Sequence, residues 1–244
     1  MAQKTILVMS GKGGVGKTTT AVNLAYTMAE TKAKVGILDV DVHGPNVPKM
    51  LGLDMEKLEV KNDKMQPVRI ANGLKVMSMA FLLDLESDSV IWRGPMKHNV
   101  IKQFLEEVEW GELDYLVVDF PPGTGDECIS AAQLASKPMG VVIVSTPQQV
   151  ALLDAKKSID FARKFDLPVI GMIENMSGGV FGADTTQLVA KQFDVPYLGA
   201  IALDQKIVEA GDSGVPFISS QSANAGSFDK IAVQIKSFFK QEGK

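Results

Sequence analysis

Eight residues near the start of the chain have the types and spacing of a phosphate-binding loop. Residues 11–18 read GKGGVGKT, which fits the pattern G-x-x-x-x-G-K-[ST], and they follow an apolar run at residues 5–9. Glycines let such a loop turn back so that successive backbone N–H groups face phosphate oxygens. Lys17 then reaches the β and γ phosphates, while the Thr18 hydroxyl ligates Mg²⁺. A helix that begins beside Lys17 adds its positive end to the same site.

We therefore expect this P-loop to bind the phosphates of ATP. A glycine-rich turn that matches by chance is the alternative, and the apolar run before the loop argues against it. The residues predicted to contact the nucleotide here are Gly11, Lys12, Gly13, Gly14, Val15, Gly16, Lys17, Thr18 and Thr19.

Acidic side chains follow two further apolar runs. Asp119 comes after residues 115–118, and Asp39 and Asp41 come at the end of the run at residues 35–38. Parallel α/β sheets bind their ligands at the carboxyl ends of the strands, so we expect these carboxylates near the phosphates. Asp119 is predicted to hold Mg²⁺ directly or through a water, because carboxylate oxygen suits that hard cation. A helix cap is the alternative for Asp119, but the prolines at 121 and 122 prevent a helix from starting there.

Hydrolysis also needs a residue that orients or deprotonates the attacking water. Asp41 is our candidate for that role, and Asp39 is our candidate for supporting the metal. Two aspartates of one short motif leave this division of roles open. The predicted Mg²⁺ ligands are thus Thr18, Asp39 and Asp119, and the predicted catalytic residues on these grounds are Lys17 and Asp41.

Composition limits the class of protein. The 244 residues are 45% hydrophobic, enough to bury the core of one α/β domain, and we expect residues 1–244 to form a single domain. A net charge of −4 gives no electrostatic footprint for nucleic acid or an anionic membrane. Cys128 is the only cysteine, which excludes an internal disulfide. No run approaches 18 apolar residues and the first apolar run is too short for a signal peptide, so we expect a cytoplasmic location.

Short apolar runs alternate with helix-forming segments along the chain. This alternation predicts an α/β fold with a mostly parallel sheet and helices on both faces. Strands are expected at residues 5–9, 35–38, 115–118, 140–144, 169–173 and 197–201. Helices are expected at residues 18–31, 94–108, 126–136, 150–165, 185–193, 205–210 and 227–239.

Residues 58–80 follow a different pattern. Pieces rich in β-forming residues at 59–61, 66–70 and 74–79 are separated by Asn62-Asp63 and Asn72-Gly73. These dipeptides favour tight hairpin turns. We predict a small antiparallel hairpin insertion or edge extension to the parallel sheet.

The octapeptide resembles the deviant Walker A motif, G-K-G-G-x-G-K-[ST], of the MinD/ParA/Mrp class of ATPases, which adds a lysine at the position of Lys12. The resemblance implies a homodimer with ATP between the subunits. In that dimer Lys12 crosses to the partner's nucleotide and serves catalysis much as an arginine finger does. A solvated loop lysine is the alternative. Residues 39–41 also resemble the D-x-D switch motif of MinD-type ATPases, which implies that Asp41 positions the water.

Further stretches resemble signatures of the Mrp/ApbC branch of this class, at residues 39–48, 92–96, 119–126, 146–152 and 173–177. They are spread over nearly the whole chain. That branch comprises dimeric ATPases that carry or scaffold iron–sulfur clusters. The resemblance implies that Asn175 contacts adenine and that the loop around Asp204 flanks the base.

One departure separates the chain from that branch. After Glu-Asn-Met-Ser the family usually places a C-P-x-C pair whose thiolates hold a shared cluster, whereas residues 177–182 read SGGVFG. Cys128 is predicted to be a small, semi-buried helix residue rather than a substitute ligand. We therefore expect that this chain alone does not hold an iron–sulfur cluster. A cysteine-bearing protein partner or an apo-protein client is expected to complete its role.

Two other functions fit the same motifs. A ParA/MinD-like ATPase uses ATP-dependent dimerisation for positioning on a surface; the missing cysteine pair favours this reading, and the acidic net charge opposes it. A nucleotide-binding regulator with incidental hydrolysis is the third function. The apolar positions of the last expected helix fit docking on the sheet better than membrane binding. We expect neither nucleic acid nor a membrane as a partner.

Overall fold

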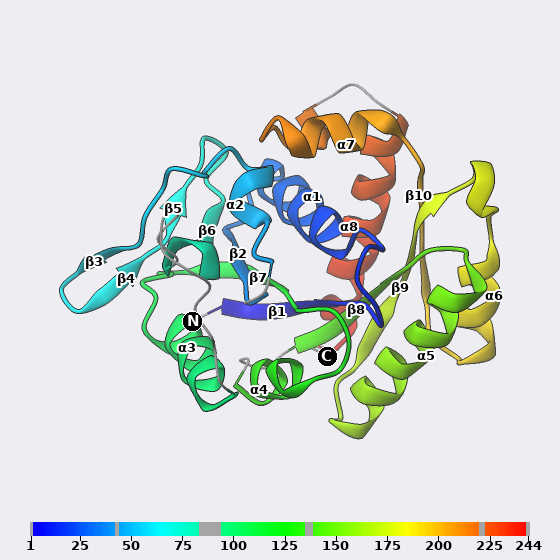
Figure 1. The fold of residues 1–244 in the computed structure, drawn as a ribbon, viewed down its shortest axis with the longest axis horizontal. Helices are drawn as coiled ribbons and strands as arrows, with labels where there is room; N and C mark the ends of the chain where they lie inside the picture. The colour runs from blue at the N-terminus through cyan, green and yellow to red at the C-terminus, as the bar shows by residue number, and fades with distance from the viewer. Residues whose placement is uncertain (1, 42–43, 83–93, 135–138, 220–222, 243–244) are drawn as a thin grey trace.

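The computed structural model describes residues 2–41, 44–82, 94–134, 139–219 and 223–242, and its centre is an eight-stranded sheet (Figure 1). The strand order is β10-β9-β8-β1-β7-β2-β6-β5, and all neighbours pair in parallel except β5 with β6. The strands are β1 (Ala2–Met9), β2 (Val35–Asp39), β5 (Val68–Arg69), β6 (Lys75–Ser78), β7 (Leu113–Asp119), β8 (Met139–Ser145), β9 (Val169–Ser177) and β10 (Tyr197–Ala202). The predicted α/β fold with a mostly parallel sheet is confirmed.

Helices cover both faces of this sheet. In Figure 1, α1 (Lys17–Glu30) and α8 (Ala223–Glu242) lie on one side, and α3 (Gly94–Glu106), α4 (Asp126–Leu134) and α5 (Gln149–Lys164) lie on the other. The shorter helices are α2 (Val47–Met50), α6 (Thr185–Gln192) and α7 (Gln205–Asp212), with 3₁₀ turns at Met79–Leu82, Gly179–Phe181 and Phe217–Ser219. The expected helix at 126–136 is observed to Leu134, because residues 135–138 lie outside the described part of the chain.

The apolar patterns explain why these elements form. Every residue of β8 is buried, as expected for a parallel strand covered on both faces. On α1, the stripe Ala21, Leu24, Ala25 and Met28 is fully buried against the sheet. Spacing of i, i+3, i+4 and i+7 places those four side chains on one face of the helix. The core therefore lies in two layers, one on each side of the sheet.

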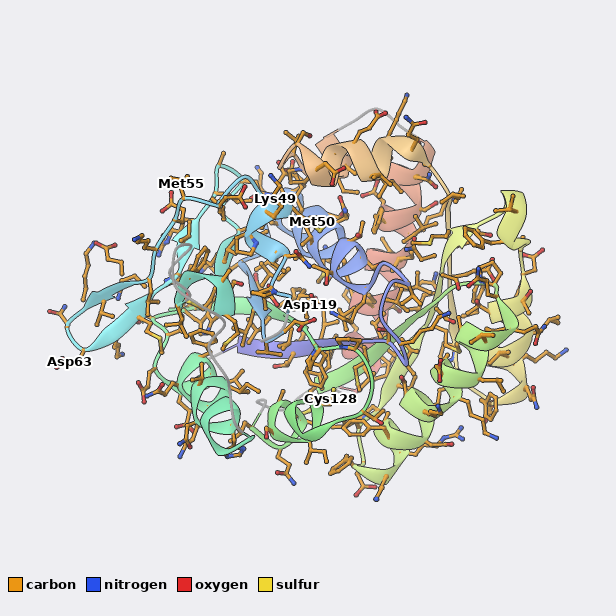
Figure 2. All side chains as sticks on the ribbon, viewed as in Figure 1. Lys49, Met50, Met55, Asp63, Asp119 and Cys128 are labelled. Atoms are coloured by element: carbon orange, nitrogen blue, oxygen red, sulfur yellow. The ribbon has the colours of Figure 1, made fainter. Side chains whose placement is uncertain are left out.

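Residues 58–82 differ in part from the expected antiparallel insertion. A separate hairpin of β3 (Glu59–Lys61) and β4 (Lys64–Gln66) turns at Asn62 and Asp63, which both have positive φ, as a two-residue hairpin turn of this kind requires. Figure 2 shows Asp63 at the outer tip of this hairpin. The edge extension is also present, because β6 pairs in parallel with β2 and carries β5 as an antiparallel edge; the parallel pairing of β6 was not predicted. A short strand between two turns carries no local signal of its partner.

The sheet order brings together the ends of strands that are far apart in sequence. Central strand β1 lies between β7 and β8, and β2 lies on the other side of β7. The carboxyl ends of these strands carry most of the residues that were predicted to bind nucleotide. Among the described helices, none is long and apolar enough to cross a membrane. Of the expected signatures, residues 42–43 and 92–93 lie outside the described residues.

Candidate nucleotide-binding site

The loop between β1 and α1 has the backbone of an anion-binding turn. Gly14 and Gly16 have φ of 78° and 80°, a left-handed conformation that costs glycine little. No side chain caps the start of α1, so the N–H groups of its first turn remain available to an anion. Ser10 secures the entrance of the loop, because its Oγ donates to the Lys12 carbonyl at 2.9 Å and its carbonyl accepts from the Gly123 N–H at 2.9 Å.

Lys17, Thr18 and Asp119 meet at the base of this loop. The Lys17 Nζ donates to Asp119 Oδ1 at 2.6 Å, and the Thr18 Oγ1 donates to Asp119 Oδ2 at 2.7 Å. Lys17 is 6% exposed and Asp119 is fully buried, at the interior position marked in Figure 2. The contact follows from the sheet, since parallel pairing of β1 with β7 sets Val8 beside Asp119. The structure thus brings together an ammonium, a hydroxyl and a carboxylate predicted to handle phosphate and metal.

Asp39 lies next to Asp119 on the neighbouring strand. The two residues are register partners of β2 and β7, so their side chains point to the same face of the sheet. Burial, together with the charge of Asp119, raises the pKa of Asp39 to about 8. Burial also raises the pKa of Asp119, although Lys17 opposes this. Two buried carboxylates with raised pKa values form a pocket that favours a cation.

Hydrogen bonds give Asp39 a second role in the segment that follows β2. Its carboxylate accepts from the Asp41 N–H at 3.1 Å, the Val47 N–H at 3.2 Å and the Ser78 hydroxyl at 3.0 Å. Asp41 in turn accepts from the Gly44 N–H at 3.2 Å. Asp39 therefore fixes the start and the end of the segment that carries Asp41.

The phosphate side of the site is a cavity of about 230 Å³. The P-loop forms most of its wall, and Asp41 enters it from the segment after β2. Its lining residues are Ser10, Lys12, Gly13, Gly14, Gly16, Lys17, Thr18, Thr19, Asp41, Gly44, Asn46 and Pro122. Asp41 thus shares one cavity with the P-loop, as expected of a residue that acts on the terminal phosphate.

A second cavity of about 330 Å³ adjoins the first, and Gly16, Thr18 and Thr19 line both. Asn175 and Asp204 line this second cavity, so the structure brings the two predicted base-site residues together. Its other walls come mainly from α2 and α7 and are largely apolar: Asn46, Lys49, Met50, Met176, Ala202, Leu203, Ile207, Val208, Gly211 and Asp212. Figure 2 shows Lys49 and Met50 on α2. A flat aromatic base with a few polar edges suits such a cavity.

The two residues predicted to lie at the base differ in how they are held. Asp204 caps α7 by accepting from the Lys206 N–H at 2.9 Å, and it also accepts from Asn224 Nδ2 at 3.2 Å. Asn175 is 7% exposed, and its Nδ2 donates to the Val15 carbonyl at 2.8 Å. Asn175 therefore contacts the P-loop itself as well as the second cavity.

Glu174 organises the loop that follows β9. Its Oε1 accepts from the Ser177 hydroxyl at 2.6 Å and the Asp184 N–H at 3.0 Å, and its Oε2 accepts from the Thr186 N–H at 2.9 Å. Burial raises the pKa of Tyr197 to about 12, and the negative charges of Glu174 and Asp184 add to this effect. One buried carboxylate thus holds both ends of the loop at residues 177–184.

The cysteine Cys128 packs against the segment that follows β7. Cys128 is fully buried at the start of α4, with its Sγ 3.4 Å from the Gly123 carbonyl. It was expected to be semi-buried, and the fuller burial strengthens the interpretation that it is a packing residue. In the portion of the chain that the structure describes, no three His, Cys, Asp or Glu side chains are grouped so as to hold a metal.

Sequence reasoning missed several residues of the site region, among them Lys49, Met50, Ser78 and Glu174. Ser78 ends β6 beside Asp39, and a strand-end position was the available signal. Glu174 directly precedes Asn175, so its place at a strand end was also readable. Lys49 and Met50 reach the second cavity only in the folded chain, because α2 packs near α7, which is distant from it in the sequence.

The fold and this site define the chain as a P-loop NTPase. A family model described as "ParA: NUBPL iron-transfer P-loop NTPase" matches residues 1–236. The chain belongs to that family. The resemblance drawn from the sequence motifs is therefore confirmed.

Relatives and solved structures agree with this assignment. An iron–sulfur cluster carrier protein of Methanocaldococcus jannaschii is 44% identical over 98% of this chain and 85% of its own length. A cytosolic Fe-S cluster assembly factor of Saccharomyces cerevisiae is 46% identical over 84% of this chain and 75% of its own. A nucleotide-binding protein from Archaeoglobus fulgidus in complex with ADP is 37% identical, with a TM-score of 0.77 over 88% of each chain. The cell division ATPase MinD of Pyrococcus furiosus shares the fold at 21% identity, with a TM-score of 0.76 over 98% of this chain and all of its own.

Proposed function

We propose that this chain is a Mg²⁺-dependent ATPase that works as a dimeric switch in iron–sulfur cluster assembly or transfer. The observation that carries the ATPase part is the meeting of Lys17, Thr18 and Asp119 beneath the P-loop, at distances of 2.6 and 2.7 Å. The adjoining cavity with Asn175 and Asp204 provides a place for the base. An ADP complex of the 37% identical protein from Archaeoglobus fulgidus supports nucleotide as the ligand.

The donor set of this site fits magnesium. A hydroxyl and two buried carboxylates with raised pKa values are hard oxygen ligands, and Thr18, Asp39 and Asp119 would hold the ion directly or through water. Bound Mg²⁺ supplies positive charge that offsets the phosphates and these carboxylates. Lys17 exchanges its bond to Asp119 for phosphate oxygens when ATP binds, and the P-loop N–H groups orient the same phosphates.

Asp41 is the residue that we propose to orient the attacking water. Asp41 lines the phosphate cavity, and Asp39 holds its segment from both ends. Removal of such a group lowers turnover more than it lowers affinity. Asp41→Ala should therefore keep ATP affinity within about threefold of the parent and slow hydrolysis by about a hundredfold. Loss of affinity equal to the loss of turnover would contradict this role.

The dimer is supported by two features beside the P-loop. Lys12 lines the phosphate cavity, and its ammonium makes no hydrogen bond with any other described residue. Val150 and Leu153 on α5 are 63% and 66% exposed, and the Asp154 backbone of the same helix packs against Gly11. Two chains that face each other across these residues would bury the apolar side chains and bring each Lys12 to the partner's phosphates.

Light scattering of Asp41→Ala with Mg-ATP tests this arrangement. We expect a dimer, and we expect the Asp41→Ala, Lys12→Ala double variant to remain a monomer under the same conditions. A monomer in both cases would contradict the proposed dimer, while unchanged ATP binding would leave the nucleotide site intact.

The iron–sulfur part rests on the family and on the names of its members. The loop where the resemblance predicts a C-P-x-C pair offers hydrogen-bonding groups but no thiol, and Cys128 is buried elsewhere. We propose that cluster ligands come from a cysteine-bearing partner or an apo-protein client, and that this takes place in the cytoplasm. Anaerobic reconstitution of the purified chain with iron and sulfide, followed by desalting, should leave less than stoichiometric iron. Near-stoichiometric iron and sulfide with the absorbance of a [4Fe–4S] centre would overturn this part.

A further inference from the structure

Asn175, which is predicted to contact the base, also makes a hydrogen bond to the P-loop that binding of the base does not require. Its Nδ2 donates to the Val15 carbonyl at 2.8 Å, across from β9 to the loop after β1. Asn175 is only 7% exposed, so water would not freely replace this hydrogen bond if the side chain were removed. Gly16 packs directly on the same amide, and a Cβ at that position would overlap Asn175 Nδ2.

This hydrogen bond fixes the orientation of one peptide group of the loop. In a trans peptide the C=O and the N–H point in opposite directions. The Val15 carbonyl faces Asn175, so the N–H of Gly16 in the same peptide unit faces away from it. Gly16 lines both the phosphate cavity and the base cavity, and it lacks a side chain that could hold its backbone in place. The Gly16 carbonyl accepts from the Thr20 N–H at 2.9 Å, but that carbonyl belongs to the next peptide unit. Among the described contacts, the bond from Asn175 is therefore the one that orients the Val15–Gly16 peptide.

Asn175 also lines the base cavity, where its remaining groups are available. An asparagine amide offers two N–H donors and one carbonyl oxygen, and only one donor is used on Val15. A single side chain thus lies between the cavity proposed for the base and a peptide of the loop that lines the phosphate cavity.

We propose that Asn175 is a positioning residue of the P-loop, which sets the Val15–Gly16 peptide for phosphate binding independently of any base. The proposal rests on the nucleotide-binding function proposed above and deepens it. It predicts that affinity for a triphosphate without a base depends on a residue of the base cavity.

Inorganic tripolyphosphate is the probe that separates the two roles. Its affinity in the presence of Mg²⁺, measured by calorimetry, should fall by roughly three- to tenfold in Asn175→Leu, which keeps the branched shape of the side chain and removes the donor. Asn175→Ala provides a second variant, and thermal melting of each shows that the measured chain is folded. ATP affinity should fall at least as much in both variants, because they lose the base contact as well.

Val208→Ala is the matched control. Val208 lines the base cavity from α7, is 59% exposed and has no polar group that could hold the P-loop. This variant should weaken ATP binding and leave tripolyphosphate affinity within twofold of the parent. Unchanged tripolyphosphate affinity in the folded Asn175 variants, with weaker ATP binding, would assign Asn175 to the base alone and overturn the proposal. A parent that binds neither ATP nor tripolyphosphate would instead remove the proposed nucleotide site itself.

Discussion

Two glycine-rich loops leave the carboxyl edge of the sheet, and they differ in what their chemistry depends on. The P-loop follows β1, and the loop at residues 177–184 follows β9. Two adjacent residues of β9 hold these loops: Asn175 bonds to the P-loop, and Glu174 bonds to both ends of the second loop. Phosphate binding uses backbone N–H groups and one lysine, whereas a cluster needs thiolate side chains. The fold can therefore keep one function and lose the ligands of the other without changing its scaffold.

Among the substitutions that test the difference between the two loops, removal of the Lys17 side chain should have the largest effect, a loss of ATP affinity. Lys17→Ala takes away the charge proposed to face the β and γ phosphates, and we expect ATP affinity to fall by about a hundredfold or more. Lys12→Ala, measured at concentrations where the chain is a monomer, should stay within about threefold of the parent. Titration calorimetry with Mg-ATP gives both values. Equal affinity in Lys17→Ala and the parent would refute the P-loop assignment.

The buried carboxylate Asp39 should make stability depend on pH. Its pKa of about 8 in the folded chain lies above the ordinary value of about 4. The folded state thus keeps a proton that the unfolded state has released, so this contribution to stability is fully present below pH 4 and is lost as pH rises toward 8. Between pH 5 and 8, with chelator and without nucleotide, the parent should lose several degrees of melting temperature more than Asp39→Asn does. Asp63→Asn, at the exposed tip of the β3–β4 hairpin, should follow the parent.

Glu174 should matter for the second loop and not for the first. In Glu174→Gln one carboxylate oxygen becomes an amide nitrogen that faces an N–H or hydroxyl donor. We expect a loss of about 1–3 kcal/mol in the free energy of unfolding, measured with urea. ATP affinity should stay within twofold of the parent. The same substitution at exposed Glu209 should change stability by less than about 0.5 kcal/mol. A large drop in ATP affinity in Glu174→Gln would show that the two loops are not independent.

The backbone conformation of the second loop should make non-glycine residues at its glycine positions destabilising. Gly178 has φ of 90° and ψ of −174°, and Gly179 has φ of 57°. A Cβ on Gly178 would meet no neighbour, so backbone strain alone should make Gly178→Ala cost about 1–2 kcal/mol of unfolding free energy. Val180→Ala, at a side chain that is 91% exposed, should be neutral within about 0.5 kcal/mol. Equal stability of both variants would show that the loop can adopt a cysteine-compatible backbone without cost.

The positions of the P-loop and Asp119 could be predicted because short, continuous sequence motifs identify them. Glycine spacing specifies the loop, and an aspartate after an apolar run specifies a strand end. The hydrogen bonds of Ser78 and Glu174 were not predictable in the same way. Ser78 bonds to Asp39 on another strand, and the bonds of Glu174 depend on the path of the loop that follows β9. The parallel partner of β6 also escaped prediction, because a four-residue strand between turns shows its own conformation and not its neighbour. Long-range pairing is decided by the whole core.

The central position of β1 has a consequence for how the chain folds. This strand is made well before its partners β7 and β8, so Ala2 waits for Leu113 and Thr5 waits for Met139. Contacts between such distant residues carry a high loop-closure entropy and slow folding. Asn175 and β9 are made later still, so the P-loop peptide can be set only after β9 has been made. A growing chain therefore gains the complete phosphate site late, after most of its apolar strands have already been exposed and need protection from aggregation.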